Sequence, residues 1–312
     1  MNDSLPSRIY RYQSFSALSV EALCHDQLYY SDPSRFNDPL DCSPSIEPDT
    51  DIHTLRNILS ELIKKRVESE VLSSLKLARI NENEGKTHAI RQANKSAADE
   101  LHNIAYLATN PDYEGTVEDA EKWQLTYTIQ SELVKQNNQG VCCLSEEYDN
   151  PLLWSHYGNQ HSGFCVGYSL DRKPTPKIYQ VNYGGSRTIK TSLIANAILA
   201  NNILAQKELE ESVLLRKAKP WEYEKEWRII DNVDLQDSPL KLEEIIFGLR
   251  CPDAIMYSVI ESLKSRDIKF YSMYPCRQSF DLRRTSDIHE SCSYFPRISR
   301  SGIEIFGPPD TD

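Results

Sequence analysis

A polar, glycine-poor stretch at residues 51–137 separates two strand-rich parts of the chain. Its apolar residues recur at helical spacing, as at Leu55, Ile58 and Leu62, so each helix can bury one face and expose the other. An all-helical insertion between strand-rich parts indicates an α+β fold. We expect three or four amphipathic helices in it, with breaks near residues 81–86 and 109–116.

The predicted strands outside this insertion are short and end at turn-forming residues. They lie at residues 8–15, 28–31, 140–147, 163–170, 178–184, 242–248, 268–275 and 278–284. The sequence predicts further helices at residues 16–27 (capped by Ser16 or Ser19), 150–158, 192–217 and 252–266. We therefore expect one α+β domain over residues 1–312, with a mixed or antiparallel sheet, the helical insertion at about 51–137 and a C-terminal strand–helix–strand unit at about 242–285. The tail at 306–312 is expected to be frayed.

The formal net charge is −11, and no run of five or more Lys or Arg residues occurs. This balance gives no drive for non-specific binding to nucleic acid. No stretch approaches about 18 consecutive apolar residues, and the first residues lack the pattern of a signal peptide, so we expect a cytoplasmic protein without membrane contact. The eight cysteines form no CxxC pair, so we expect neither disulfides nor a metal site. Nothing in the sequence sets an oligomeric state.

Four common enzyme motifs do not occur: the GxxxxGK[ST] phosphate loop, GxGxxG, HExxH and GxSxG. The sequence therefore gives no support for a P-loop NTPase, a kinase, a simple Rossmann dehydrogenase or an α/β-hydrolase. Polar residues that could carry chemistry gather in four other clusters.

The first cluster is in the strand at 8–15, where Arg11 alternates with Tyr10 and Tyr12 and so points to the opposite face. Arg11 is either a solvated residue of an amphipathic strand or a guanidinium that binds phosphate or carboxylate. The second cluster is the loop after residues 28–31. The polar residues of this loop are Asn37, Asp38 and Asp41. They favour a structural turn, with a ligand-binding loop as the alternative.

The third cluster contains Trp154, His156, Tyr157 and His161. On a helix Trp154 and Tyr157 share a face, whereas two histidines five positions apart are poorly spaced for one metal ion. Each histidine is read first as a satisfied buried imidazole. Gly163, at the start of the next strand, indicates close backbone packing.

The fourth cluster is PWEYEKEWRII at residues 220–230. In one continuous strand Glu222, Glu224 and Glu226 would repel one another on a shared face. We expect a loop over 220–225 and a strand that begins at Glu226. The glutamates either lie on a solvated strand face or line a cleft with two carboxylates, which suits chemistry at an anomeric carbon.

Taken in order, these clusters resemble an uncharacterised bacterial family, domain of unknown function 2971. The segments that carry the resemblance are YRYQS, LYYSDPSRFNDPLDC, CLSEEYDNPLLWSHYGNQHSGFCVGY and KPWEYEKEWRII. The resemblance runs from about residue 8 to 285 and is most variable over 51–137. It implies no established activity, and it is compatible with a part in bacterial phage defence or a toxin system.

The chain also resembles, more distantly, the ADP-ribosyltransferase superfamily. That resemblance implies an ADP-ribosyltransferase-like sheet, NAD as substrate and catalytic residues Glu226, Glu224 and Arg11. It further implies a nucleotide-binding group; this group comprises Tyr12, Ser145, Trp154, His156 and Tyr157. The chain departs from the family pattern because CLSEE keeps only the first serine of the usual triplet, Ser145.

The leading expectation is an NAD-using ADP-ribosyltransferase or NAD glycohydrolase that cleaves the nicotinamide–ribose bond, with any acceptor being a protein or nucleic acid. The alternative is a non-catalytic nucleotide-binding sensor on the same fold. A third reading is a nuclease with His156 or His161 as general base, which the acidic net charge disfavours.

Overall fold

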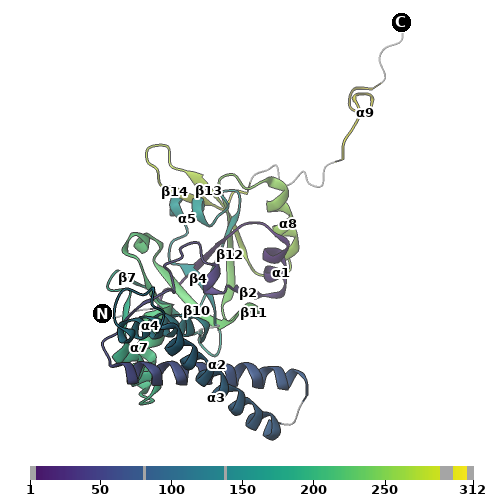
Figure 1. Ribbon diagram of the computed structural model, residues 1–312. Coiled ribbons are helices and arrows are strands. Elements are labelled where there is room, and N and C mark those ends of the chain that lie inside the picture. Colours follow the sequence, from purple (N-terminus) through teal and green to yellow (C-terminus); the bar gives the residue numbers. More distant parts are fainter. Residues whose placement is uncertain (1–4, 80–81, 137–138, 289–297, 308–312) are drawn as a thin grey trace.

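The computed structural model describes residues 5–79, 82–136, 139–288 and 298–307. Eight strands form the central sheet: β1 (Ile9–Gln13), β4 (Gln139–Ser145), β5 (Phe164–Ser169), β6 (Tyr179–Gln180), β10 (Glu226–Asn232), β12 (Lys241–Phe247), β13 (Lys269–Pro275) and β14 (Leu282–Thr285). Their order is β14-β13-β12-β5-β1-β4-β10-β6 (Figure 1). The β12–β13 pair is parallel and the other pairs are antiparallel, so the protein is α+β with a mixed sheet, as expected.

The described residues also form three two-stranded sheets. They are β2 (Gln27–Tyr30) with β11 (Asp234–Asp237), β3 (Ser45–Glu47) with β8 (Thr188–Lys190), and β7 (Asn182–Tyr183) with β9 (Arg216–Lys217). Between β1 and β2 lies α1 (Ala17–His25), which begins where the sequence predicts. Ser16 is its N-cap: Ser16 Oγ accepts the Ser19 N–H, and Ser19 Oγ accepts the Ser16 N–H, which completes a capping box.

The helical insertion consists of three helices: α2 (Ile52–Leu77), α3 (Glu82–Leu107) and α4 (Val117–Gln136). The break expected near residues 109–116 is confirmed. The break expected near residues 81–86 lies earlier in the chain, because α3 already begins at Glu82. Gly85 is inside α3, and a Cβ there would lie 3.1 Å from Leu75 Cδ1. Gly85 therefore permits a close approach of α2 and α3 and does not end a helix.

The two faces of the sheet bury different apolar clusters. On one face Leu55 and Ile58 of α2 join Leu125 of α4, Val141 of β4 and Leu214 in a single core, so the insertion shares its core with the sheet. The opposite face packs against α1 and α8 (Asp253–Leu263). Figure 1 shows α1 and α8 together on one side of the sheet, with α2 and α3 extending away from it below.

The segment at 178–184 differs from the single strand expected there. It forms β6 at the edge of the central sheet and then β7 in a separate sheet. Val181 lies between them with its side chain buried; its N–H donates to Glu226 O, while Asn182 N–H donates to Leu215 O. The chain thus changes partners at Val181, which the alternation of its side chains does not reveal.

The remaining predicted helices are present with shifted ends. Residues 192–217 divide into α6 (Thr191–Ile198), α7 (Ile203–Leu214) and β9, and α5 (Pro151–His156) lies between β4 and β5. The unit β12–α8–β13 is the expected C-terminal strand–helix–strand unit, followed by β14. Beyond it lies α9 (Gly302–Phe306), and residues 308–312 of the tail expected to be frayed lie outside the described residues. Within the described ranges, no helix has both the length and the apolar character required to cross a membrane.

Candidate functional site

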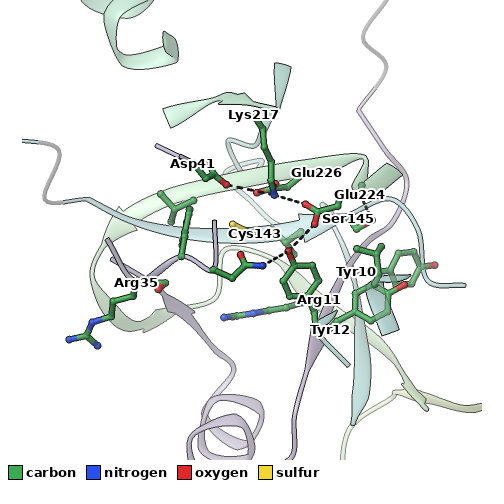
Figure 2. A pocket seen from close by; sticks show the side chains of 17 residues that line it. Tyr10, Arg11, Tyr12, Arg35, Asp41, Cys143, Ser145, Lys217, Glu224 and Glu226 are labelled. Atoms are coloured by element: carbon green, nitrogen blue, oxygen red, sulfur yellow. Dashed lines mark hydrogen bonds and ion pairs between the residues drawn. The ribbon is translucent and has the colours of Figure 1, made fainter. Parts of the chain in front are cut away.

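A cavity of about 300 Å³ lies where β1 and β4 separate (Figure 2). The two strands pair only at Tyr10 and Ser145, and the loop from Ser31 to Asp41, with the short helix η1 (Pro33–Arg35), closes the gap. The volume is at the lower end of the range for small-molecule sites. Glu224 and Glu226 both line this cavity, so the structure brings together the two glutamates that the sequence singled out.

Glu226 is the first residue of β10, as predicted, and Arg228 follows two positions later on the same face. The Arg228 side chain is 0% exposed, and Arg228 Nε lies 2.7 Å from Glu226 Oε1. Its other donors are also used: Nη1 donates to Leu214 O (2.6 Å) and Nη2 to both oxygens of Asp41 (2.9 and 2.8 Å). Arg228 is therefore an internal counter-ion for two carboxylates and not a ligand-binding group.

Lys217 joins the two glutamates. Its Nζ lies 2.5 Å from Glu224 Oε2, 2.7 Å from Glu226 Oε2 and 3.7 Å from Asp41 Oδ2. Figure 2 shows this side chain reaching down between the three carboxylates. Lys217 occupies this place because β9, only two residues long, is paired with β7.

The cluster carries three carboxylates (Asp41, Glu224 and Glu226) against two cations (Lys217 and Arg228), and hence one net negative charge when all five are ionised. Burial by itself would raise the pKa of Glu226, but the charges of Arg228 and Lys217 outweigh it and lower that pKa to about 2. For Glu224 burial prevails over the attraction of Lys217, and its pKa is raised. Glu224 is thus the carboxyl of this pair that takes up a proton more readily.

Glu224 ends the short helix η2 (Lys219–Glu224), and Lys225 follows in a left-handed conformation (φ 43°). This turn replaces the predicted loop over 220–225. It leaves Glu222 exposed, whereas Glu224 is only 4% exposed, so the reading of solvated glutamates is wrong for Glu224 and Glu226. Tyr157 Oη donates to Glu224 Oε1 (2.8 Å) and accepts a bond from Asn37 Nδ2 (3.3 Å).

Ser145 lines the cavity, but its hydroxyl is occupied by the backbone. Ser145 Oγ donates to Glu224 O (2.5 Å) and accepts from Glu147 N–H (2.9 Å). These two hydrogen bonds of Ser145 Oγ connect the turn before β10 to the end of β4. Its direct part in nucleotide binding stays a prediction.

Arg11 extends from the face of β1 opposite to Tyr10 and Tyr12, as the alternation predicts. Arg11 Nη2 donates to Tyr29 O of β2 (2.8 Å), while Tyr12 Oη donates to Glu147 O (2.7 Å). Arg11 and Arg35 both line the cavity, and neither forms an ion pair with any residue that the structure describes. The cavity thus has a negative part around Glu224 and Glu226, and its lining also includes two arginines without an ion-pair partner among the described residues.

Two predicted ligand-binding residues do not line the cavity. Trp154 is 0% exposed, and its Nε1 donates to Tyr148 O (2.8 Å), so the indole is a core residue with no face for a base. His156 is exposed and packs near Trp221, with ring centroids 6.2 Å apart. His161 stacks on Trp154 and is likewise absent from the cavity wall. We leave all three out of the proposed site.

Several site residues were missed at the level of the sequence. Arg228 was detectable, because on a strand beginning at Glu226 it must share the face of that glutamate. Asp41 was assigned to a turn, although it is buried beside Arg228. No local pattern indicates Lys217, Arg35 or Cys143, whose places depend on tertiary pairing.

No group of three or more His, Cys, Asp or Glu side chains placed to hold a metal ion is found among the residues that the structure describes. The seven cysteines in the described ranges are free thiols.

Comparison with known proteins was made at the level of family models, curated proteins and solved structures. Residues 153–229 match a family model described as "Protein of unknown function (DUF2971)". That segment runs from α5 to the middle of β10 and includes Tyr157, Lys217, Glu224, Glu226 and Arg228. No curated protein and no solved structure matches the chain. In the segment that carries these five residues, the chain is similar to the DUF2971 family of proteins of unknown function.

Proposed function

We propose that the cavity between β1 and β4 binds NAD and that the protein cleaves its nicotinamide–ribose bond, as an NAD glycohydrolase or an ADP-ribosyltransferase. One observation carries the proposal: Glu224 and Glu226 line the same cavity and share Lys217, in a buried cluster with one net negative charge. A buried negative charge stabilises the positive charge that develops on a ribose ring when a glycosidic bond breaks.

The proposed reaction is heterolytic. The C1′–N bond breaks, its electron pair goes to the pyridinium nitrogen, and neutral nicotinamide leaves. A lone pair of water, or of an acceptor hydroxyl, then forms a new bond to C1′. The proton lost by this nucleophile passes to Glu224, whose raised pKa suits a proton acceptor, and then to solvent. Glu226, with its pKa of about 2, stays ionised and supplies the negative charge.

The other walls of the cavity are compatible with the rest of a dinucleotide. Arg11 and Arg35 offer guanidinium groups without ion-pair partners in the described structure, which suits a pyrophosphate. Phe36 and Tyr157 offer aromatic surface. The resemblance to ADP-ribosyltransferases selects NAD among nucleotides, and a protein or nucleic-acid acceptor and a part in defence or a toxin system belong to the same proposal.

Release of nicotinamide from NAD tests the proposal. Wild type is compared with Glu224→Gln, Glu226→Gln and the matched control Glu222→Gln, which changes an exposed glutamate of the same segment. We expect Glu226→Gln to abolish release, Glu224→Gln to reduce it by roughly 100-fold and Glu222→Gln to leave it unchanged. Circular dichroism checks that each variant is folded. If a folded Glu226→Gln variant released nicotinamide at the wild-type rate, the proposed mechanism would be wrong.

A second candidate is a nucleotide-binding sensor without turnover. It is favoured by the fact that both oxygens of Glu226 already accept bonds, from Arg228 Nε and Lys217 Nζ. In the sensor, this engaged carboxylate would hold the cavity in shape without taking part in a reaction. Thermal-shift measurements with NAD and ADP-ribose separate the two candidates, because stabilisation by NAD without nicotinamide release identifies the sensor.

The nuclease reading gains no support from the geometry. His156 is exposed and His161 stacks on the buried Trp154. Neither histidine lines the cavity that contains Glu224 and Glu226.

A further inference from the structure

A second cavity, of about 430 Å³, meets the first at Lys217, which lines both. Its walls come from three segments that are distant in sequence: the turn Gly184–Arg187 after β7, the residues Arg216–Lys219 of and after β9, and Asp38 with Leu40 from the loop that covers the first cavity. The short β7–β9 pairing holds the first two segments together.

Positive charge prevails in this second cavity. Lys217 is neutralised by Glu224 and Glu226, and Lys219 Nζ lies 2.5 Å from Glu222 Oε1. Two arginines remain without a carboxylate partner among the described residues. Arg216 Nη1 donates only to a neutral carbonyl, Ser186 O (3.0 Å), and the Arg187 side chain is exposed and forms no hydrogen bond or ion pair within the described structure.

One carboxylate, that of Asp38, lies on the same wall. Its Oδ2 accepts a bond from Trp221 Nε1 (2.8 Å), which fixes its position. Two unpaired arginines against one carboxylate leave one net positive charge. In a chain with a formal net charge of −11, this local excess favours anions over other small molecules.

The backbone of the turn is open to a ligand. Gly184 and Gly185 adopt φ values of +80° and +78°, and a Cβ on Gly185 would meet no atom within 4 Å. In the described part of the chain, the N–H groups of Gly185 and Ser186 donate to no acceptor. Consecutive free N–H groups in a glycine turn are a common means of holding an anion.

We propose that this second cavity binds a phosphate-bearing ligand, with its phosphoryl oxygens held by Arg187, Arg216 and the N–H groups of Gly185 and Ser186. Phosphate fits better than a carboxylate, because donors approach from two arginines and from the turn. A phosphoryl group presents three acceptor oxygens around one atom, whereas a carboxylate presents two in a plane. This proposal does not depend on NAD cleavage, since Arg187 and Arg216 are not part of the first cavity.

Titration calorimetry with inorganic pyrophosphate on the full chain tests it. The first cavity also has two arginines, so Arg11→Gln/Arg35→Gln serves as the background protein. We expect this background protein to bind pyrophosphate, and addition of Arg187→Gln or Arg216→Gln to weaken binding by roughly 10-fold each, the usual effect of one charge-assisted hydrogen bond. Arg91→Gln, an exposed arginine of α3, is the matched control and should change nothing.

Two results would overturn the proposal: no pyrophosphate binding by the background protein, or binding unchanged when Arg187→Gln and Arg216→Gln are combined in it. Arg216 also contacts the turn through Ser186 O, so Arg187→Gln alone decides the matter if Arg216→Gln alters the far-UV circular dichroism. Nicotinamide release is measured on the single variant Arg187→Gln in the wild-type chain. It should be retained there, so the two proposals can fail separately.

Discussion

Glu226 and Arg228 form a buried ion pair two positions apart on β10, with Arg228 Nε 2.7 Å from Glu226 Oε1. Neither side chain reaches bulk water: they are 3% and 0% exposed. A buried pair costs the solvation of both ions, so it persists only where further bonds satisfy the remaining donors and acceptors. Here Asp41 and Lys217 supply those bonds, and Lys217 also links Glu224 to the same network, which makes five connected residues.

The first prediction concerns Arg228. Replacement by methionine, which fills similar space without charge, leaves Asp41 and Glu226 buried without their guanidinium. We expect the free energy of unfolding at pH 7 to fall by about 3 to 5 kcal/mol, the usual cost of removing one member of a buried pair. Urea denaturation measures it. Arg283→Met, at an exposed position of β14, is the control and should stay within about 0.5 kcal/mol of wild type. A small loss for Arg228→Met would mean that the network does not stabilise the fold.

The second prediction is a pH dependence specific to Glu226. Its pKa is about 2 in the folded protein and near the ordinary 4.5 in the unfolded chain. Between these values the unfolded chain binds more protons, so stability falls as the pH falls. Above pH 4.5 the contribution of the ionised carboxylate is complete. The difference in unfolding free energy between wild type and Glu226→Gln should therefore be constant from pH 7 to 5 and shrink towards pH 3. A difference that does not vary with pH would show that the folded pKa is not lowered.

The third prediction concerns the charge shared between Lys217 and Glu224. Lys217→Met removes one cation and leaves Arg228 alone against three carboxylates, so the fold should be strongly destabilised at pH 7. Glu224→Gln then removes one of the carboxylates that lost its partner. We expect the double variant to be more stable than Lys217→Met, with a coupling energy of at least about 1 kcal/mol in a double-mutant cycle. Additive effects would contradict direct coupling.

Much of the fold was predictable because it is encoded in local periodicity. The i, i+3, i+7 spacing of Leu55, Ile58 and Leu62 marks a helix wherever it lies, and all three side chains are buried as that spacing requires. The start of β10 at Glu226 was predictable from repulsion among the glutamates. The change of strand partner at Val181 was not predictable, because it depends on which edges of distant strands are available for pairing.

The site was predictable only in part, for a similar reason. Glu224 and Glu226 are recognisable as a pair, but Lys217 reaches them from a two-residue strand whose position is set by β7. Trp154 was predicted to bind a ligand but is a core residue. In sequence, an aromatic residue within a polar cluster is equally compatible with stacking on a ligand and with burial in the core. In the structure the indole lies in a buried cluster with Cys165 and Ile246, and the Tyr12 ring packs edge-on against it with the ring centroids 5.1 Å apart.

The last prediction concerns Gly163, where the sequence indicated close backbone packing. A Cβ at this position would lie 2.3 Å from Gln13 O and 3.0 Å from Gly158 O. Both neighbours are backbone atoms, fixed by β1 and by the turn after α5, so neither can rotate away. Gly163→Ala should therefore lower the free energy of unfolding by about 3 kcal/mol, at the upper end of the range for overpacking. Gly302→Ala is the matched control, because a Cβ there meets nothing within 4 Å. Equal urea midpoints for Gly163→Ala and wild type would show that β1 and β5 are free to move apart where Gln13 faces Gly163.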